Sequence, residues 1–206
     1  KKVILETDHP ADCAAKLISG KVDIGLIPVA VLPLIKEYHI ISDYCIGSNG
    51  NVRTVLLLSN CRFEEIGSVY LDYRSRSSVT LSKVLAKNFW NREFRWMNTS
   101  KGFDFRNIGL TDAVVLIGDQ CFEYEKSFIS GVDLAGEWMK FTGLPFVFAC
   151  WTSNKPIDPV FIEEFNSALR VGVSNIDSVV KNIGEDGSIT GEVLKRYLTE
   201  NIDYNF

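Results

Sequence analysis

The stretch Val69–Leu85, VYLDYRSRSSVTLSKVL, decides the fold class of this chain. A short apolar strand, Val69–Tyr73, runs into the polar sequence Arg-Ser-Arg-Ser-Ser (74–78) and then into an amphipathic helical pattern that reaches Trp90. A strand that passes almost directly into a helix is the basic unit of an α/β fold.

The junction between this strand and this helix is also a candidate binding site. In parallel α/β sheets, ligands gather at the carboxyl ends of strands, beside helix N-termini whose first N–H groups are unpaired and carry a partial positive charge. Ser75, Arg76, Ser77 and Ser78 add hydroxyl donors and a guanidinium group, so together they predict a site for an anion. A simple N-cap at Ser77 beside solvated arginines would give the same pattern.

Strands and helices alternate along the whole chain. Strands are expected near 22–28, 39–48, 52–60, 69–73, 93–98, 112–119 and 144–151. Helices are expected near 10–19, 31–38, 78–90, 133–143, 159–185 with a break near Gly172, and 190–201 with Thr190 as N-cap. This order predicts an α/β fold with mostly parallel sheets.

Two strand-rich blocks are joined twice, near Ser59–Ile66 and again through the apolar segment 144–151. Such wiring suits a hinged protein with two lobes and a ligand cleft. A single doubly wound sheet fits the alternation equally well, and the pattern leaves both architectures open.

Composition excludes several classes of function. The 206 residues are 46% hydrophobic and carry a net charge of −4, with Lys and Arg scattered, which argues against a nucleic-acid partner. The sequence has no apolar run of about 18 residues, so no membrane span is predicted. No signal segment is visible at the start. Five widely spaced cysteines without a C-x-x-C pair indicate buried free thiols and a cytoplasmic location.

The chain shows no pattern for a metal or a bound cofactor. His9 and His39 are its two histidines, and neither belongs to a readable catalytic triad or metal-ligand set. No glycine fingerprint for a nucleotide occurs either, so we expect no cofactor and no metal.

Three further segments carry polar groups that are candidates for lining a cleft. The loop around Ser48 and Asn49 favours a tight hairpin, or donors that face a ligand. Asp119 follows a buried strand and fits a helix cap, a ligand contact or a general base. Thr142 precedes the buried segment 144–151.

Several phrases, in order over essentially the whole chain, resemble the chorismate dehydratases of the futalosine route to menaquinone. They are GKVDIGLIPVAVLP, IISDYCIGSNGNV, LDYRSRSSVTL, VVLIGDQ, DLAGEWMKFTGLPFVFACW and YLTENIDY. The resemblance implies the two-lobed fold of type II periplasmic binding proteins, with a ligand cleft between two mixed sheets. It places lobe one at 1–58 plus 150–206 and lobe two at 59–149.

The resemblance also implies a reaction: loss of water from chorismate to give 3-[(1-carboxyvinyl)oxy]benzoate, by a monomer or homodimer. Ser75–Ser78 would then hold a substrate carboxylate, with Ser48 and Asn49 facing them from lobe one and Asp119 and Thr142 lining the cleft from lobe two. The family begins with a strand that ends in a Tyr-Leu-Asn type motif, which is absent here. Lobe one is therefore expected to lack that strand, and the catalytic residues stay unassigned.

Three other functions are compatible with parts of the pattern. A non-catalytic solute-binding protein for a small carboxylate would share the fold, but it usually carries a signal segment and paired cysteines. The sister enzyme dihydroxynaphthoate synthase uses a histidine in its second lobe, and no histidine follows His39. A ligand-sensing domain of a transcription regulator would need a helix-turn-helix segment upstream.

Overall fold

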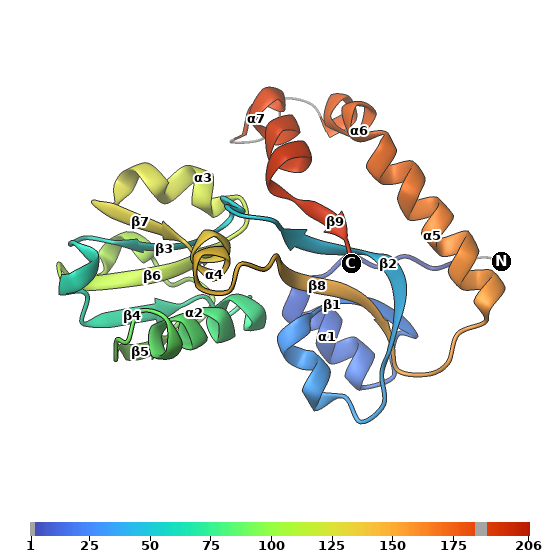
Figure 1. Ribbon diagram of the computed structural model, residues 1–206, viewed down its shortest axis with the longest axis horizontal. Coiled ribbons are helices and arrows are strands. Elements are labelled where there is room, and N and C mark those ends of the chain that lie inside the picture. The colour runs from blue at the N-terminus through green and yellow to red at the C-terminus, as the bar shows by residue number, and fades with distance from the viewer. Residues whose placement is uncertain (1–2, 184–188) are drawn as a thin grey trace.

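The computed structural model describes residues 3–183 and 189–206, and it arranges the strands of these residues in two separate sheets (Figure 1). The first sheet has the order β1-β8-β2-β9, and the second has the order β5-β4-β6-β3-β7. The two-lobed architecture is therefore confirmed, and the single doubly wound sheet is wrong.

The first sheet is antiparallel throughout its described pairings. Its strands are β1 (Ile24–Pro28), β2 (His39–Ser48), β8 (Phe146–Ser153) and β9 (Asp203–Asn205). Helix α1 (Pro10–Ile18) and the 3₁₀ helix η1 (Val29–Leu34) pack on β1 through a small core that includes Leu17, Ile27 and Val31. The expected helix at 31–38 is thus only this short 3₁₀ turn, because Pro33 interrupts it.

The second sheet is mixed. Its strands are β3 (Val55–Ser59), β4 (Ser68–Leu71), β5 (Arg95–Asn98), β6 (Asp112–Ile117) and β7 (Ser130–Asp133). Strand β4 runs parallel to β5 and β6, whereas β3 runs antiparallel to β6 and β7. The expectation of mostly parallel sheets is therefore wrong, since the parallel pairs are confined to β4, β5 and β6.

Helices cover both faces of the second sheet, with α3 above it and α2 below it in Figure 1. Helices α2 (Arg76–Asn88) and α4 (Leu134–Thr142) share one core with the sheet, through residues such as Leu81, Leu85 and Leu134. The other face is covered by α3 (Gln120–Tyr124) and the 3₁₀ turn η3 (Phe105–Asn107). Two further 3₁₀ turns are η2 (Phe63–Glu65) and η4 (Glu125–Ser127). Because both faces are covered, all five residues of β3 are buried.

The chain crosses between the sheets through 49–54, which joins β2 to β3, and through 143–145, which joins α4 to β8. Strand β3 pairs within the second sheet, although the expected boundary at 58 placed most of it in lobe one. Strand β8 likewise begins at Phe146, before the expected boundary at 150. We propose that the lobes divide at these two crossings, with 55–142 as lobe two and the rest of the chain as lobe one.

The segment from Pro159 to the C-terminus is mainly helical and ends in a strand. Helices α5 (Pro159–Ser174), α6 (Ile176–Ile183) and α7 (Gly191–Arg196) are followed by the π-helix η5 (Tyr197–Asn201) and by β9. The Thr190 hydroxyl accepts from the Val193 N–H at 3.4 Å, so the expected N-cap is confirmed. Residues 184–185, the end of the helical segment expected from the sequence, lie outside the described residues.

Helix α5 runs through Gly172, where a break was expected, and ends at Ser174. A Cβ atom built on Gly172 would meet nothing within 4 Å. Since glycine in a helix interior costs about 0.5–1 kcal/mol relative to alanine, Gly172→Ala is expected to raise the free energy of unfolding by about that amount. Urea denaturation measures this, and a loss of stability would mean that the helix breaks at this position after all.

Candidate functional site

One edge of the second sheet faces the crossings between the lobes and gathers most of the candidate residues. Strands β4 and β6 are parallel, so both end at this edge, while the antiparallel strand β3 begins there. Helices α2, α3 and α4 all start where β4, β6 and β7 end. Three helix N-termini therefore converge near the crossings (Figure 1).

Ser75 is the N-cap of α2, rather than Ser77. Its Oγ accepts from the Ser78 N–H at 3.2 Å and donates to the Ser78 Oγ at 2.8 Å. Ser75 has an extended backbone with φ −124° and ψ 111°, which is the ordinary conformation of an N-cap. The expectation of Ser77 as the N-cap is therefore wrong, because the helix already begins at Arg76.

Ser77 ties the start of α2 to the first sheet. Its Oγ donates to the Phe148 carbonyl of β8 at 2.9 Å and accepts from the Ala30 N–H of η1 at 3.5 Å. Ser77 is therefore a contact between the lobes, and the N-terminus of α2 faces η1 and β8 directly.

Asp72 and Arg74 form a partly buried ion pair just before the helix. The Asp72 carboxylate is fully buried and accepts from the Arg74 backbone N–H at 3.0 Å, from its Nε at 2.9 Å and from its Nη2. The amide of Gln120 abuts the same guanidinium, and its oxygen, turned toward Arg74, accepts from Nη1 at 2.6 Å. Hydrogen bonding to Asp72 raises the pKa of Arg74 above its usual value, so the guanidinium stays charged. Its charge is compensated by the Asp72 carboxylate.

Arg76, at the first position of α2, is exposed and has no ion pair or hydrogen bond with the described residues. A cation with no partner beside a helix N-terminus capped only by a hydroxyl favours an anionic ligand. Helix α4 differs, because its N-terminus already holds a carboxylate: Asp133 accepts from the N–H groups of Ala135 at 3.0 Å and Gly136 at 3.1 Å. The charge pattern therefore favours α2 as the site for an external anion.

Within the described part of the chain, the other four candidates are not hydrogen-bonded to Ser75–Ser78, although Asp119 follows β6 at the same edge of the sheet. Ser48 is buried at the end of β2 and donates to the Gly50 carbonyl at 2.9 Å. Thr142 donates to the Trp138 carbonyl at 2.9 Å and accepts from the Leu144 N–H at 3.1 Å, so its hydroxyl closes the end of α4. Asp119 is exposed at the start of α3 and caps no backbone N–H.

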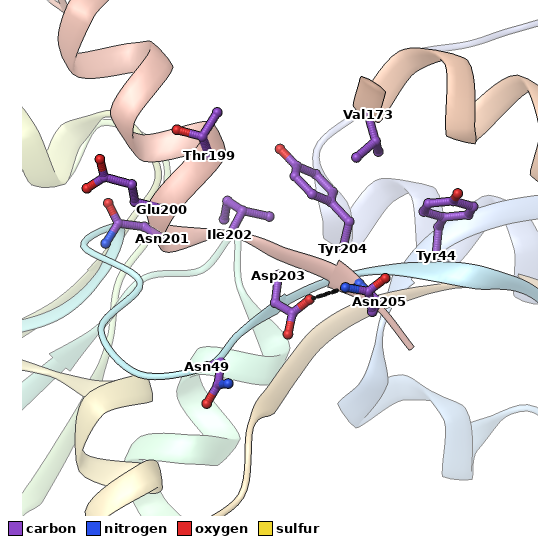
Figure 2. Close-up of a pocket in the computed structure, with 10 residues that line it drawn as sticks. All are labelled: Tyr44, Asn49, Val173, Thr199, Glu200, Asn201, Ile202, Asp203, Tyr204 and Asn205. Carbon is purple, nitrogen blue, oxygen red and sulfur yellow. Dashed lines mark hydrogen bonds between the residues drawn. The ribbon is translucent and has the colours of Figure 1, made fainter. Parts of the chain in front are cut away.

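Asn49 is exposed and lines a cavity of about 340 Å³ on another part of lobe one. Figure 2 shows the rings of Tyr44 and Tyr204 rising toward Val173 of α5, with Asn49 apart from them on the loop after β2. A second cavity, of about 430 Å³, lies beside the first crossing and is lined by Arg53, Asp133 and Asn201 among others. Neither cavity is lined by Ser75–Ser78. Ser77 is instead hydrogen-bonded directly to lobe one.

Four of the five cysteines are buried, and Cys13 is half-buried. Burial raises the pKa of Cys121 to about 12 and that of Cys45 to about 11. Thiols held neutral in this way are poor nucleophiles. In the described residues, no group of three or more His, Cys, Asp or Glu side chains is arranged to hold a metal ion.

Two residues of this edge were not predicted from the sequence. Asp72 looked like an ordinary strand-end acid, although an Asp-x-Arg spacing can signal a local carboxylate–guanidinium pair. Thr54, at the start of β3, bonds to Tyr197 from the far end of the chain at 2.9 Å. No local pattern predicts a contact across 143 residues.

Two sheets, two crossings and a helix N-terminus that faces the opposite lobe define the two-lobed fold of type II periplasmic binding proteins. Solved structures share this fold. A protein from Archaeoglobus fulgidus matches with a TM-score of 0.65 and 16% identity, over 96% of this chain and 75% of that one. The alkanesulfonate-binding protein of Xanthomonas axonopodis pv. citri matches with a TM-score of 0.54 and 13% identity, over 93% of this chain and 71% of that one.

The chain belongs to the menaquinone biosynthesis family, whose model matches residues 1–206. A chorismate dehydratase of Thermus thermophilus is 24% identical over 209 residues, which cover 92% of this chain and 76% of that protein. The expected family and fold are thereby confirmed. Within residues 3–183 and 189–206, no helix is both long enough and apolar enough to span a bilayer.

Proposed function

We propose that this protein is a chorismate dehydratase, a carbon–oxygen lyase that converts chorismate to 3-[(1-carboxyvinyl)oxy]benzoate in menaquinone biosynthesis. The observation that carries the proposal within the fold is the N-terminus of α2, where Arg76 has no polar partner among the described residues and Ser77 contacts the other lobe. Family membership and the similarity to the Thermus thermophilus chorismate dehydratase support the choice of substrate.

The proposed reaction is a 3,4-elimination. The C3–H bond breaks and a base takes the proton, the electron pair of that bond forms the new ring double bond, and the C4–O bond breaks to release hydroxide, which becomes water on protonation. The ring becomes aromatic, and no net oxidation or reduction occurs. Aromatisation supplies the driving force, so the protein has only to hold the substrate, position the proton acceptor and donor, and exclude water.

The start of α2 fits the first of these tasks. A substrate carboxylate there would meet the partial positive charge of the helix and the guanidinium of Arg76, which can donate two parallel hydrogen bonds. The Ser77 hydroxyl would either leave Phe148 and Ala30 to bind the ligand, or keep these two hydrogen bonds as a contact between the lobes. The residues that accept and donate the proton are left unassigned.

The test is to incubate the full-length protein with chorismate and to follow the product by absorbance and mass spectrometry. Formation of 3-[(1-carboxyvinyl)oxy]benzoate is the expected result. Tight binding without turnover would favour the alternative, a non-catalytic protein that binds a small carboxylate. Absence of both binding and turnover would remove the proposed substrate.

A further inference from the structure

The last ten residues of the chain connect both lobes. Strand β9 pairs with β2 in lobe one, and the Phe206 N–H donates to the Asp43 carbonyl at 2.9 Å. The π-helical turn η5 lies against the first crossing, where Asn201 donates to the Asn51 carbonyl at 3.0 Å, and against α3 of lobe two, where Tyr197 meets Phe122. This segment therefore forms a third link between the lobes (Figure 1). Single π-turns are rare and occur often at functional positions.

Tyr197 is the main contact of this segment with the first crossing and with lobe two. Its hydroxyl forms a hydrogen bond with the Thr54 Oγ1 at 2.9 Å, and its ring meets the edge of Phe122 of α3 at 5.7 Å between centroids. Burial raises the pKa of the phenol, so the hydroxyl stays protonated near neutral pH. Thr54 is itself almost fully buried.

A continuous chain of contacts leads from Tyr197 to the start of α2. The Thr54 carbonyl accepts from the Gly118 N–H at 2.9 Å, which fixes the loop at the end of β6. In that loop, Gln120 contacts the guanidinium of Arg74, and Arg74 is held by Asp72. The Asp72 carbonyl then accepts from the Ser75 N–H, the N-cap of α2, at 3.3 Å.

We infer that Tyr197 is a positioning residue for the anion site at Ser75–Ser78, acting through Thr54, the 118–120 loop and the Asp72–Arg74 pair. The kinetic part of this inference rests on the proposed function. By bonding to Thr54, the C-terminal segment holds the edge of lobe two so that the N-terminus of α2 faces lobe one.

The test compares Tyr197→Phe, Thr54→Val and the double variant, which all remove the same hydrogen bond with little change of shape. In chorismate turnover, each is expected to raise KM about fivefold, the size of one neutral hydrogen bond, with kcat held, because the site binds ground and transition states alike. The double variant is expected to be no worse than either single one, since only one bond is lost. Tyr204→Phe is the matched control, because the Tyr204 hydroxyl lies in the same segment and has no hydrogen-bond partner in the described residues.

Hydrogen exchange of the full-length protein supplies a readout that does not depend on turnover. The amides of 71–81 and 118–122 are expected to exchange faster in Tyr197→Phe than in the parent, and to be unchanged in Tyr204→Phe. If the parent does not convert chorismate but exchange changes as expected, the proposed function fails and the network stands. Unchanged exchange, an unchanged KM or additive effects in the double variant would overturn the inference.

Discussion

Replacing Asp72 by alanine is expected to lower the free energy of unfolding by about 3 kcal/mol, among the largest effects of any single polar substitution in this chain. The carboxylate is fully buried and holds Arg74 through two side-chain bonds and one backbone bond. Removal of one member of a buried pair costs about 3–5 kcal/mol because the other charge is left uncompensated. The lower end applies here, since the Arg74 side chain is 21% exposed and can reach water.

The chain contains a matched control for this prediction. Asp104 and Arg106 repeat the same local geometry. The Asp104 carboxylate accepts from the Arg106 backbone N–H at 3.0 Å, from its Nε at 2.9 Å and from its Nη2 at 3.0 Å. This pair lies on the surface, where such pairs contribute little. Asp104→Ala should therefore leave the urea midpoint close to that of the parent. Equal losses for Asp72→Ala and Asp104→Ala would show that burial of the first pair is not what stabilises the edge.

Arg76→Ala is expected to raise KM for chorismate about 100-fold, since hydrogen bonds to charged groups contribute about 1.5–3 kcal/mol each. The exposed Arg76 side chain forms no hydrogen bond, ion pair or ring contact with the described residues, so the unfolding midpoint should change little. Arg76→Lys should retain part of the affinity, because a lysine keeps the charge but loses the bidentate geometry.

Arg95→Ala is the control for this substitution, since Arg95 is also an exposed arginine of lobe two but lies on the edge strand β5. It should leave both KM and kcat unchanged. Equal kinetics for Arg76→Ala and the parent would remove Arg76 from the site, and a loss of stability in Arg76→Ala would mean that its role is structural.

The sequence predicts the local elements of this fold better than their pairing. The strand–Ser–helix junction at 69–90, the C-terminal cap of α4 at Gly143 with φ +72°, and Thr190 as an N-cap are all local events that side-chain chemistry decides. The direction of the strands is not decided locally, because β8 returns from lobe two to lie between β1 and β2. Nothing within 146–153 encodes its neighbours, so the mostly parallel arrangement expected from alternation was wrong.

In the candidate site, too, local features are predicted from the sequence better than tertiary contacts. The approach of α2 to lobe one follows from a rule about strand ends and helix starts, and the structure places Ser77 against β8 and η1. Thr142 has the residue type of a cleft donor, yet its hydroxyl is used by the backbone of its own helix. The contribution of Tyr197 depends on the return of the C-terminal segment to Thr54, which only the tertiary structure reveals.

The most direct test of the account is to give the full-length protein chorismate deuterated at C3 and to follow the isotope and the product together. We expect that 3-[(1-carboxyvinyl)oxy]benzoate forms, that the deuterium passes to solvent at the same rate, and that both events slow together in Arg76→Ala at low substrate concentration. Chorismate recovered unchanged, or a product that still carries the deuterium, would contradict it.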